Sequence, residues 1–100
     1  MSKSVWKYIL EPGVTTLVLP VDAMVLSVYS QGREVCLWAL VDTSEPIQRG
    51  VNAESRTFVA LATGEVAPRG SILTFISTVL INGGALVFHI FEVTQQEQKP

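Results

Sequence analysis

Hydrophobic and polar residues alternate along most of this chain, in short runs that end at glycine or proline. Because successive side chains on a strand point to opposite faces, this alternation predicts β-strands rather than helices. Turn signals such as Glu11-Pro12-Gly13 and Gln31-Gly32 separate the runs. Seven strands are predicted, over residues 5–10, 14–19, 23–30, 34–42, 56–63, 71–81 and 85–93. The sequence therefore predicts an all-β fold, a small antiparallel sandwich or barrel dominated by hairpins.

The stretch 71–93 is the most apolar part of the chain. No charged residue occurs between Ser71 and Phe91 when His89 is neutral. A run of roughly 20 apolar residues can also span a membrane as a helix. The central Asn82-Gly83-Gly84 favours a tight turn instead, because glycine adopts positive φ values without strain. The abundance of Val, Ile, Phe and Thr in both arms also favours strands, so we predict a β-hairpin.

The hairpin is predicted to be apolar on both faces. With a three-residue loop, Ile81 faces Ala85 and His89 faces Ser77. One face then carries Ile76, Thr78, Leu80, Leu86, Phe88 and Ile90, and the other carries Phe75, Ser77, Val79, Ile81, Ala85, Val87, His89 and Phe91. Both faces must be covered, one by a second sheet and the other by further structure or another subunit.

Composition favours association with further copies of the chain. Hydrophobic residues make up 48% of the 100 residues and charged residues only 16%, against roughly 25% charged in ordinary domains. A chain of this length cannot bury so much apolar surface by itself, so a homo-oligomer is predicted. We expect one domain over residues 1–100, with flexible tails at 1–4 and 94–100.

Charge and cysteine content limit the partners and the compartment. The net charge is −2 and the seven basic residues are spread singly, without the basic stripe of a nucleic-acid-binding protein. Cys36 is the only cysteine, which excludes an intrachain disulfide, and it is predicted to be a buried core residue. The N-terminus lacks an apolar secretory segment. These features predict a cytoplasmic protein that binds neither nucleic acid nor membrane.

The sequence contains no recognisable catalytic or metal-binding motif. His89 and Ser77 are a conceivable base and nucleophile, but no nucleophile-elbow motif or oxyanion loop accompanies them. One Cys and one His cannot build a closed zinc site, and the acidic residues lack calcium-loop spacing. No glycine-rich phosphate loop is present. We therefore expect a protein that is not an enzyme and has no metal or cofactor.

Three arginines are candidate anion ligands. Arg49, Arg56 and Arg69 lie in or beside the two long polar segments, 43–55 and 64–70. Guanidinium groups suit phosphate and carboxylate, and a neighbouring glycine lets a backbone N–H approach an anion. Symmetry in an oligomer would group these arginines; alternatively they are solvated surface residues.

Aromatic residues and the histidine complete the candidate ligand-binding set. Trp38 and Tyr29 are either core or interface residues or a stacking platform for a base, and His89 could add a hydrogen-bond donor.

Five sequence blocks together cover most of the chain. They are WKY at 6–8, PVDAMVLSV at 20–28, GREVCLWALVD at 32–42, RTF at 56–58 with TG at 63–64, and GGALVFHIFE at 83–92. In combination they resemble a family of small all-β proteins encoded by bacteriophages. The resemblance implies activity inside an infected host, in its cytoplasm, and assigns no catalytic residue. Some small phage proteins are oligomeric sponges that sequester nucleotide-derived signals of bacterial immunity, and this chain is similar to them in size and inferred oligomerisation.

The function expected from the sequence is that of a phage-encoded, non-enzymatic binding protein. The first hypothesis is an oligomeric sponge that sequesters a small anionic, nucleotide-like host immune signal, an anti-defence role. The alternatives are a protein–protein inhibitor or adaptor that docks a host protein through its apolar surface or a strand edge, and a small virion or structural protein.

Overall fold

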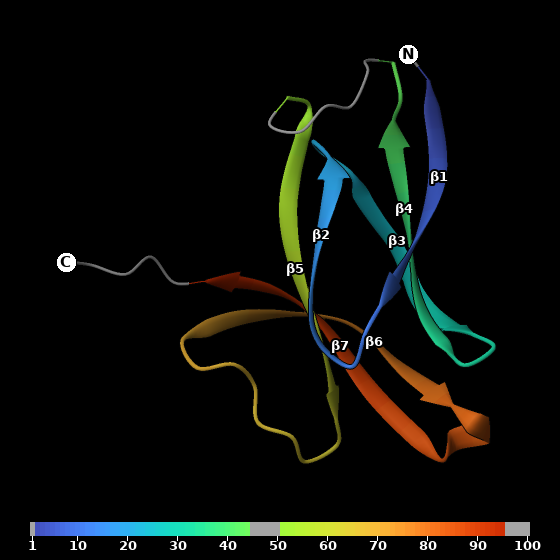
Figure 1. The fold of residues 1–100 in the computed structure, drawn as a ribbon, viewed down its shortest axis with the longest axis vertical. Coiled ribbons are helices and arrows are strands. Elements are labelled where there is room, and N and C mark those ends of the chain that lie inside the picture. Colours follow the sequence, from blue (N-terminus) through green and yellow to red (C-terminus); the bar gives the residue numbers. More distant parts are fainter. Residues whose placement is uncertain (1, 45–50, 96–100) are drawn as a thin grey trace.

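The computed structural model describes residues 2–44 and 51–95, and these residues form two antiparallel β-sheets without an α-helix (Figure 1). The predicted all-β fold with seven strands is confirmed. The strands are β1 (Lys3–Leu10), β2 (Gly13–Pro20), β3 (Met24–Gln31), β4 (Glu34–Asp42), β5 (Ala53–Ala62), β6 (Ser71–Ile81) and β7 (Leu86–Gln95). No helix among the described residues has the length and apolarity needed to cross a membrane.

One sheet has three strands in the order β1-β4-β3, and the other has four in the order β2-β5-β7-β6. The chain changes sheet between β1 and β2, between β2 and β3 and between β4 and β5. β5 pairs with β2 over 53–60 and with β7 over 57–62, so it connects two parts of the four-stranded sheet. In Figure 1 the β6–β7 hairpin runs at a steep angle to β2, with its turn below the β3–β4 hairpin.

The hydrophobic core lies between the two sheets. Alternate residues of β4 provide one side of the core and alternate residues of β5, β6 and β7 provide the other. The largest fully buried side chains are Phe58, Leu19, Leu37, Ile90, Val41, Val59, Val79 and Cys36. Val59 and Cys36 point to the outer faces of their sheets and are not part of this core. Cys36 is thus buried as predicted, although not between the sheets.

The turn of the β6–β7 hairpin is one residue longer than predicted. Ala85 takes a right-handed helical conformation (φ −65°) and its N–H donates to the Asn82 carbonyl at 3.2 Å. Ile81 consequently pairs with Leu86 rather than Ala85. His89 pairs with Thr78, so the predicted pairing of His89 with Ser77 is wrong.

A bulge in β6, between Phe75 and Ser77, absorbs this extra residue. Beyond the bulge, Phe75 pairs with Phe91, as the predicted register also requires. On the turn side of the bulge the predicted face assignments are wrong. Val79 and Ile81 share the inner face with Leu86, Phe88 and Ile90, and the outer face carries Phe75, Thr78, Leu80, Val87, His89 and Phe91.

Several strand ends differ from the prediction. β1 begins at Lys3 and β7 reaches Gln95, so residues 3–4 and 94–95, expected in flexible tails, are paired in strands. β5 begins at Ala53, three residues before the predicted start. Extended pairing with β2 along Leu19 and Pro20 accounts for this earlier start, because β2 itself continues through Pro20.

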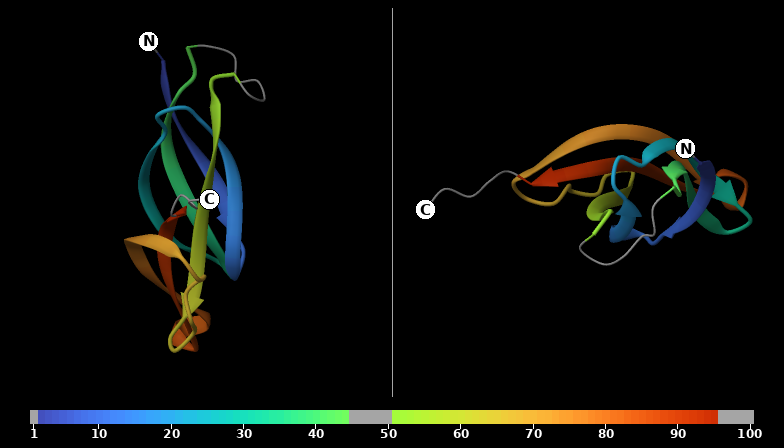
Figure 2. Two further views of the ribbon diagram at one scale, coloured as in Figure 1. Left: turned by 90° about the vertical axis from the view of Figure 1, so that its left-hand side faces the viewer. Right: turned by 90° about the horizontal axis from the view of Figure 1, so that it is seen from above.

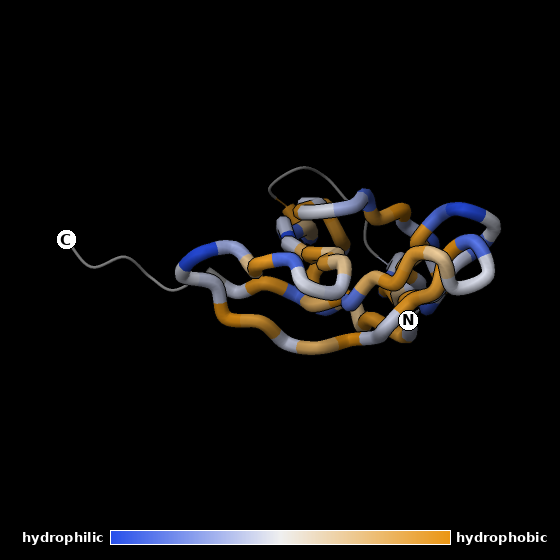
Figure 3. The backbone as a smooth tube through the Cα atoms, turned by 90° about the horizontal axis from the view of Figure 1, so that it is seen from below, coloured by the Kyte–Doolittle hydropathy of each residue, from blue (hydrophilic) through white to orange (hydrophobic). Residues whose placement is uncertain are grey.

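The fold is thin, with a shortest dimension of 17 Å (Figure 2). Two packed sheets lie roughly 10 Å apart, so this thickness leaves no room for a third layer. Apolar positions run along the strands and polar positions concentrate at the connections (Figure 3). Among the described residues, the outer faces of both sheets are therefore open to solvent and carry apolar side chains.

Candidate functional site

The outer face of the four-stranded sheet is uncharged and mostly apolar among the described residues. We call it the open face and define it by the outward-pointing side chains Val14, Thr16, Val18, Thr57, Val59, Leu61, Leu73, Phe75, Thr78, Leu80, Val87, His89, Phe91 and Val93. None of these residues is Asp, Glu, Lys or Arg. The alternation of the strands produces the face, since the inward positions of the same strands form the core.

An apolar row crosses all four strands at the centre of the open face. Val14 pairs with Val59, Val59 with Phe91, and Phe91 with Phe75. The Phe75 and Phe91 rings meet edge to face, with centroids 5.6 Å apart and an interplanar angle of 68°, a favoured aromatic geometry. Val59 is only 1% exposed, whereas Val14 and Phe75 at the two ends of the row are 56% and 58% exposed. The row is thus packed at its centre and open at its edges.

His89 is the main polar group on the open face. Thr63 Oγ1 lies 2.8 Å from its Nε2, and Thr78 Oγ1 lies 3.1 Å from its Nδ1. A neutral imidazole donates from one nitrogen and accepts at the other, and a threonine hydroxyl can do either. The ring is therefore satisfied within the chain. Ser77 pairs with Ile90 on the inner face, so the structure does not bring its hydroxyl to the imidazole.

The outer face of the three-stranded sheet is different, because it is crossed by a polar contact. Lys7 Nζ on β1 donates to Gln31 Oε1 at the end of β3, at 2.8 Å. β4 lies between these two strands, so the Lys7 side chain spans it. Cys36 of β4 has no exposed surface, in agreement with cover by the aliphatic part of a long side chain.

Tyr29 and Trp38, predicted as a stacking platform, share the outer face of the three-stranded sheet. Tyr29 pairs with Cys36 and Trp38 pairs with Ser27, which places both rings on the same side. Tyr29 is 57% exposed and Trp38 is half-buried. His89 lies on the open face of the other sheet, so the structure separates it from these rings.

Arg56 is held by an ion pair inside the fold. Its Nε and Nη2 each donate to a Glu92 carboxylate oxygen at 2.7 Å, and its Nη1 donates to the Ala23 carbonyl at 2.6 Å. The hydrogen bond to Glu92 raises the pKa of the guanidinium. The guanidinium carbon lies 5.9 Å from the centre of the Phe58 ring. This arrangement links β5, β7 and the β2–β3 connection and is typical of a structural residue.

The other two candidate arginines are not close to Arg56 in any described contact. Arg69 is exposed in the segment between β5 and β6, and Arg49 lies outside the described residues. No described contact joins Arg56 to Arg69, and the position of Arg49 relative to them lies outside the described residues. The role of the three arginines in ligand binding stays a prediction.

Sequence reasoning missed Thr63, Thr78 and Glu92. Thr78 could have been found only with the correct register of the β6–β7 hairpin. Thr63 and Glu92 could have been found only by knowing that β5 lies beside β7. Within the described part of the chain, no group of three or more His, Cys, Asp or Glu residues is arranged to hold a metal ion.

The whole chain, residues 1–100, matches the sequence family described as "Domain of unknown function (DUF7352)". The chain belongs to this family. No curated protein and no solved structure gave a significant match. Membership of DUF7352 thus assigns no activity, and the geometry above is the basis for a functional proposal.

Proposed function

We propose that this chain is a non-enzymatic binding protein that works as a homo-oligomer, in which two subunits associate through the open face. The observation that carries the proposal is the open face itself. It has no formally charged residue, and Val14, Val18, Phe75 and Leu80 on it are each at least 50% exposed. Uncharged apolar patches of this kind mark interaction sites in soluble proteins.

A second copy of the chain is the partner that best fits this surface. Burial of a whole aliphatic or aromatic side chain contributes about 1.5–3 kcal/mol, so the exposed halves of four side chains offer about 3–6 kcal/mol per subunit. Association costs about 4 kcal/mol or more. In a two-fold dimer both subunits contribute the same patch, which doubles the gain. The absence of charge on the patch also removes like-charge repulsion between copies.

The experiment is a measurement of mass in solution for the wild type and two face variants. Multi-angle light scattering after gel filtration should show a dimer or higher oligomer for the wild type. Phe75→Asp and Leu80→Asp should shift the mass toward the monomer, because each would bury an unpaired charge in the interface. Far-UV circular dichroism checks that the variants keep their strands.

Met24→Asp is the matched control, because Met24 is 60% exposed on the other sheet. It should leave the mass unchanged. A wild-type protein that is monomeric at high concentration would exclude the proposed assembly, and so would equal effects of Met24→Asp and Leu80→Asp.

A second candidate function is sequestration of a small anionic, nucleotide-like ligand by the oligomer. It is supported by the exposed Tyr29 ring beside Trp38 and by the exposed guanidinium of Arg69. The resemblance to small phage proteins would place such a role in the cytoplasm of an infected bacterium. The Lys7–Gln31 contact beside the two rings adds a cation that a phosphate would meet.

Thermal unfolding with cyclic dinucleotides, cyclic ADP-ribose isomers and inorganic phosphate tests this second candidate. A ligand at about 100 times its Kd would stabilise the folded protein by about 2.7 kcal/mol. Tyr29→Ala and Arg69→Ala should reduce the shift in Tm. If no probe raises Tm at millimolar concentration, sequestration of these ligands is excluded, while self-association through the open face is unaffected.

A further inference from the structure

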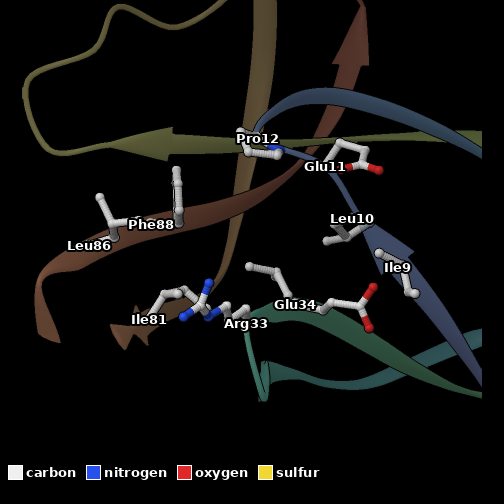
Figure 4. A pocket seen from close by; sticks show the side chains of 10 residues that line it. Ile9, Leu10, Glu11, Pro12, Arg33, Glu34, Ile81, Leu86 and Phe88 are labelled. Atoms are coloured by element: carbon white, nitrogen blue, oxygen red, sulfur yellow. The ribbon is translucent and has the colours of Figure 1, made fainter. Parts of the chain in front are cut away.

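A pocket of about 170 Å³ opens at the end of the sandwich where three turns meet (Figure 4). The β1–β2 turn, the β3–β4 turn and the strand ends at the β6–β7 turn surround it. Its apolar lining includes three buried side chains, Leu10, Val35 and Ile81, which are 3%, 6% and 5% exposed. The other apolar residues that line it are Ile9, Pro12, Leu86 and Phe88. The pocket is therefore a place where the hydrophobic core reaches the surface.

The size of this pocket suits one small apolar group. A cavity of about 150 Å³ lined by apolar side chains is known to bind benzene. Drug-sized ligands occupy larger sites of roughly 300–1,000 Å³. A phenyl or isobutyl group would thus fill the apolar part and leave the polar part of its molecule at the mouth.

The charged residues at the mouth of the pocket are divided into two groups. Figure 4 shows Arg33 extending toward Ile81, whereas the carboxylates of Glu11 and Glu34 extend toward the side of Ile9. Within the described residues, Arg33 forms no ion pair with either glutamate. The mouth thus presents a guanidinium on one side and two carboxylates on the other.

We propose that this pocket binds a small zwitterion with an apolar body, namely an apolar α-amino acid or a dipeptide that carries one. The carboxylate of the ligand would pair with Arg33, its ammonium would face Glu34 and Glu11, and its side chain would enter the apolar part. A simple anion would meet two carboxylates, and a simple cation would leave Arg33 without a partner. Only a molecule with both charges complements both sides.

The pocket lies between the sheets and not on the open face. Occupancy is therefore independent of the proposed self-association, and it involves a different kind of ligand from the nucleotide-like anion considered above.

Isothermal titration with four probes tests the charge requirement. L-Phenylalanine and L-alanyl-L-phenylalanine carry both charges, N-acetyl-L-phenylalanine lacks the ammonium, and L-phenylalaninamide lacks the carboxylate. At least one of the two zwitterions should bind, and each single-charge analogue should bind about tenfold more weakly, as expected for loss of one charge-assisted interaction.

Variants then assign the two charges to residues. Arg33→Gln should weaken binding of the zwitterion and abolish the preference for it over the amide. Glu34→Gln should reduce the preference over the N-acetyl analogue, and the double variant Glu11→Gln/Glu34→Gln should abolish it. Arg69→Gln, an exposed arginine outside the pocket, is the matched control and should change neither preference. Failure of both zwitterions to bind at millimolar concentration would overturn the proposal, as would retention of both preferences in Arg33→Gln and in the double variant.

Discussion

Arg56 and Glu92 are joined across neighbouring strands by two hydrogen bonds of 2.7 Å, although 36 residues separate them in the chain. Their side chains are 20% and 26% exposed. The pair therefore lies mostly out of water. There, an arginine–carboxylate pair joined by two hydrogen bonds is strong, and a charge left without its partner lowers the stability of the fold. This geometry explains why an arginine selected from the sequence as an anion ligand already holds a carboxylate of its own chain.

Removal of the Glu92 charge should destabilise the fold. Glu92→Gln leaves the Arg56 guanidinium without its anionic partner, and we expect a loss of about 1–3 kcal/mol in the free energy of unfolding. Urea denaturation gives the value. Glu54→Gln is the control, because Glu54 interacts with Arg56 only through charge at longer range. Comparable losses of unfolding free energy in the two variants would show that the Arg56–Glu92 ion pair is not the important contact.

The β6–β7 turn should depend on glycine at position 84. Gly84 has φ +98°, and a Cβ there would meet only the Leu80 side chain at 3.7 Å. The cost of Gly84→Ala therefore comes from the backbone conformation rather than from a clash, and we expect about 1–2 kcal/mol. Gly83→Ala, at φ +64° and ψ +21°, enters a left-handed region that side chains tolerate better. Denaturation should rank Gly84→Ala as the more damaging of the two; the reverse order would contradict the turn geometry.

Stability should depend on Asp42 in acid. The carboxylate accepts a hydrogen bond from the Ser44 N–H at 2.9 Å, and hydrogen bonds from Ser44 lower the pKa of Asp42 below its ordinary value of 3.8. A lowered folded pKa contributes stability above the unfolded value, and that contribution is lost as the pH falls through the folded pKa. Wild type should be more stable than Asp42→Asn at neutral pH, and the difference in the free energy of unfolding should disappear as the pH falls below the lowered folded pKa of Asp42.

Urea denaturation at several pH values measures this difference. Ser44→Ala removes the side-chain donor and keeps the backbone donor, so it should show part of the effect. A difference between wild type and Asp42→Asn that does not change with pH would contradict the assignment.

Cys36 should react with thiol reagents only when the fold opens. Its side chain has no exposed surface, so labelling of the folded protein should be at least about a hundredfold slower than labelling in denaturant. A cysteine at the exposed position 24, made as Met24→Cys in a Cys36→Ala background, is the control and should react at the rate of a free thiol. Rapid labelling of Cys36 in the folded protein would show that β4 is not covered as described.

The strands could be predicted from the sequence because alternation of apolar and polar residues is a local property. The sequence did not reveal which strands pair with one another in the sheets. β1 pairs with β4, from Lys3 opposite Asp42, and nothing within either strand specifies the other. The β3–β4 hairpin, however, could be predicted because a short turn joins its two strands; the turn residues are Gly32 and Arg33, with Gly32 at φ +63°.

The hairpin register depended on a residue without a distinctive signal. Ala85 takes an ordinary right-handed conformation, which most residues can adopt, so the sequence does not reveal that the turn includes it. This single residue decided whether His89 faces Ser77 or Thr78. The sequence did indicate that both faces of the hairpin are apolar, and this part of the candidate site could be predicted.

The two bulges described by the strand registers both fall on strands at the edge of a sheet. One lies in β3, between Val25 and Ser27, and the other in β6, between Phe75 and Ser77. A bulge interrupts the regular row of backbone donors and acceptors that a further strand would need. Addition of copies along these edges is thereby discouraged, whereas the broad apolar face remains available. Each sheet thus has one edge, β3 or β6, at which growth by addition of a strand is discouraged, and one edge, β1 or β2, whose register is unbroken.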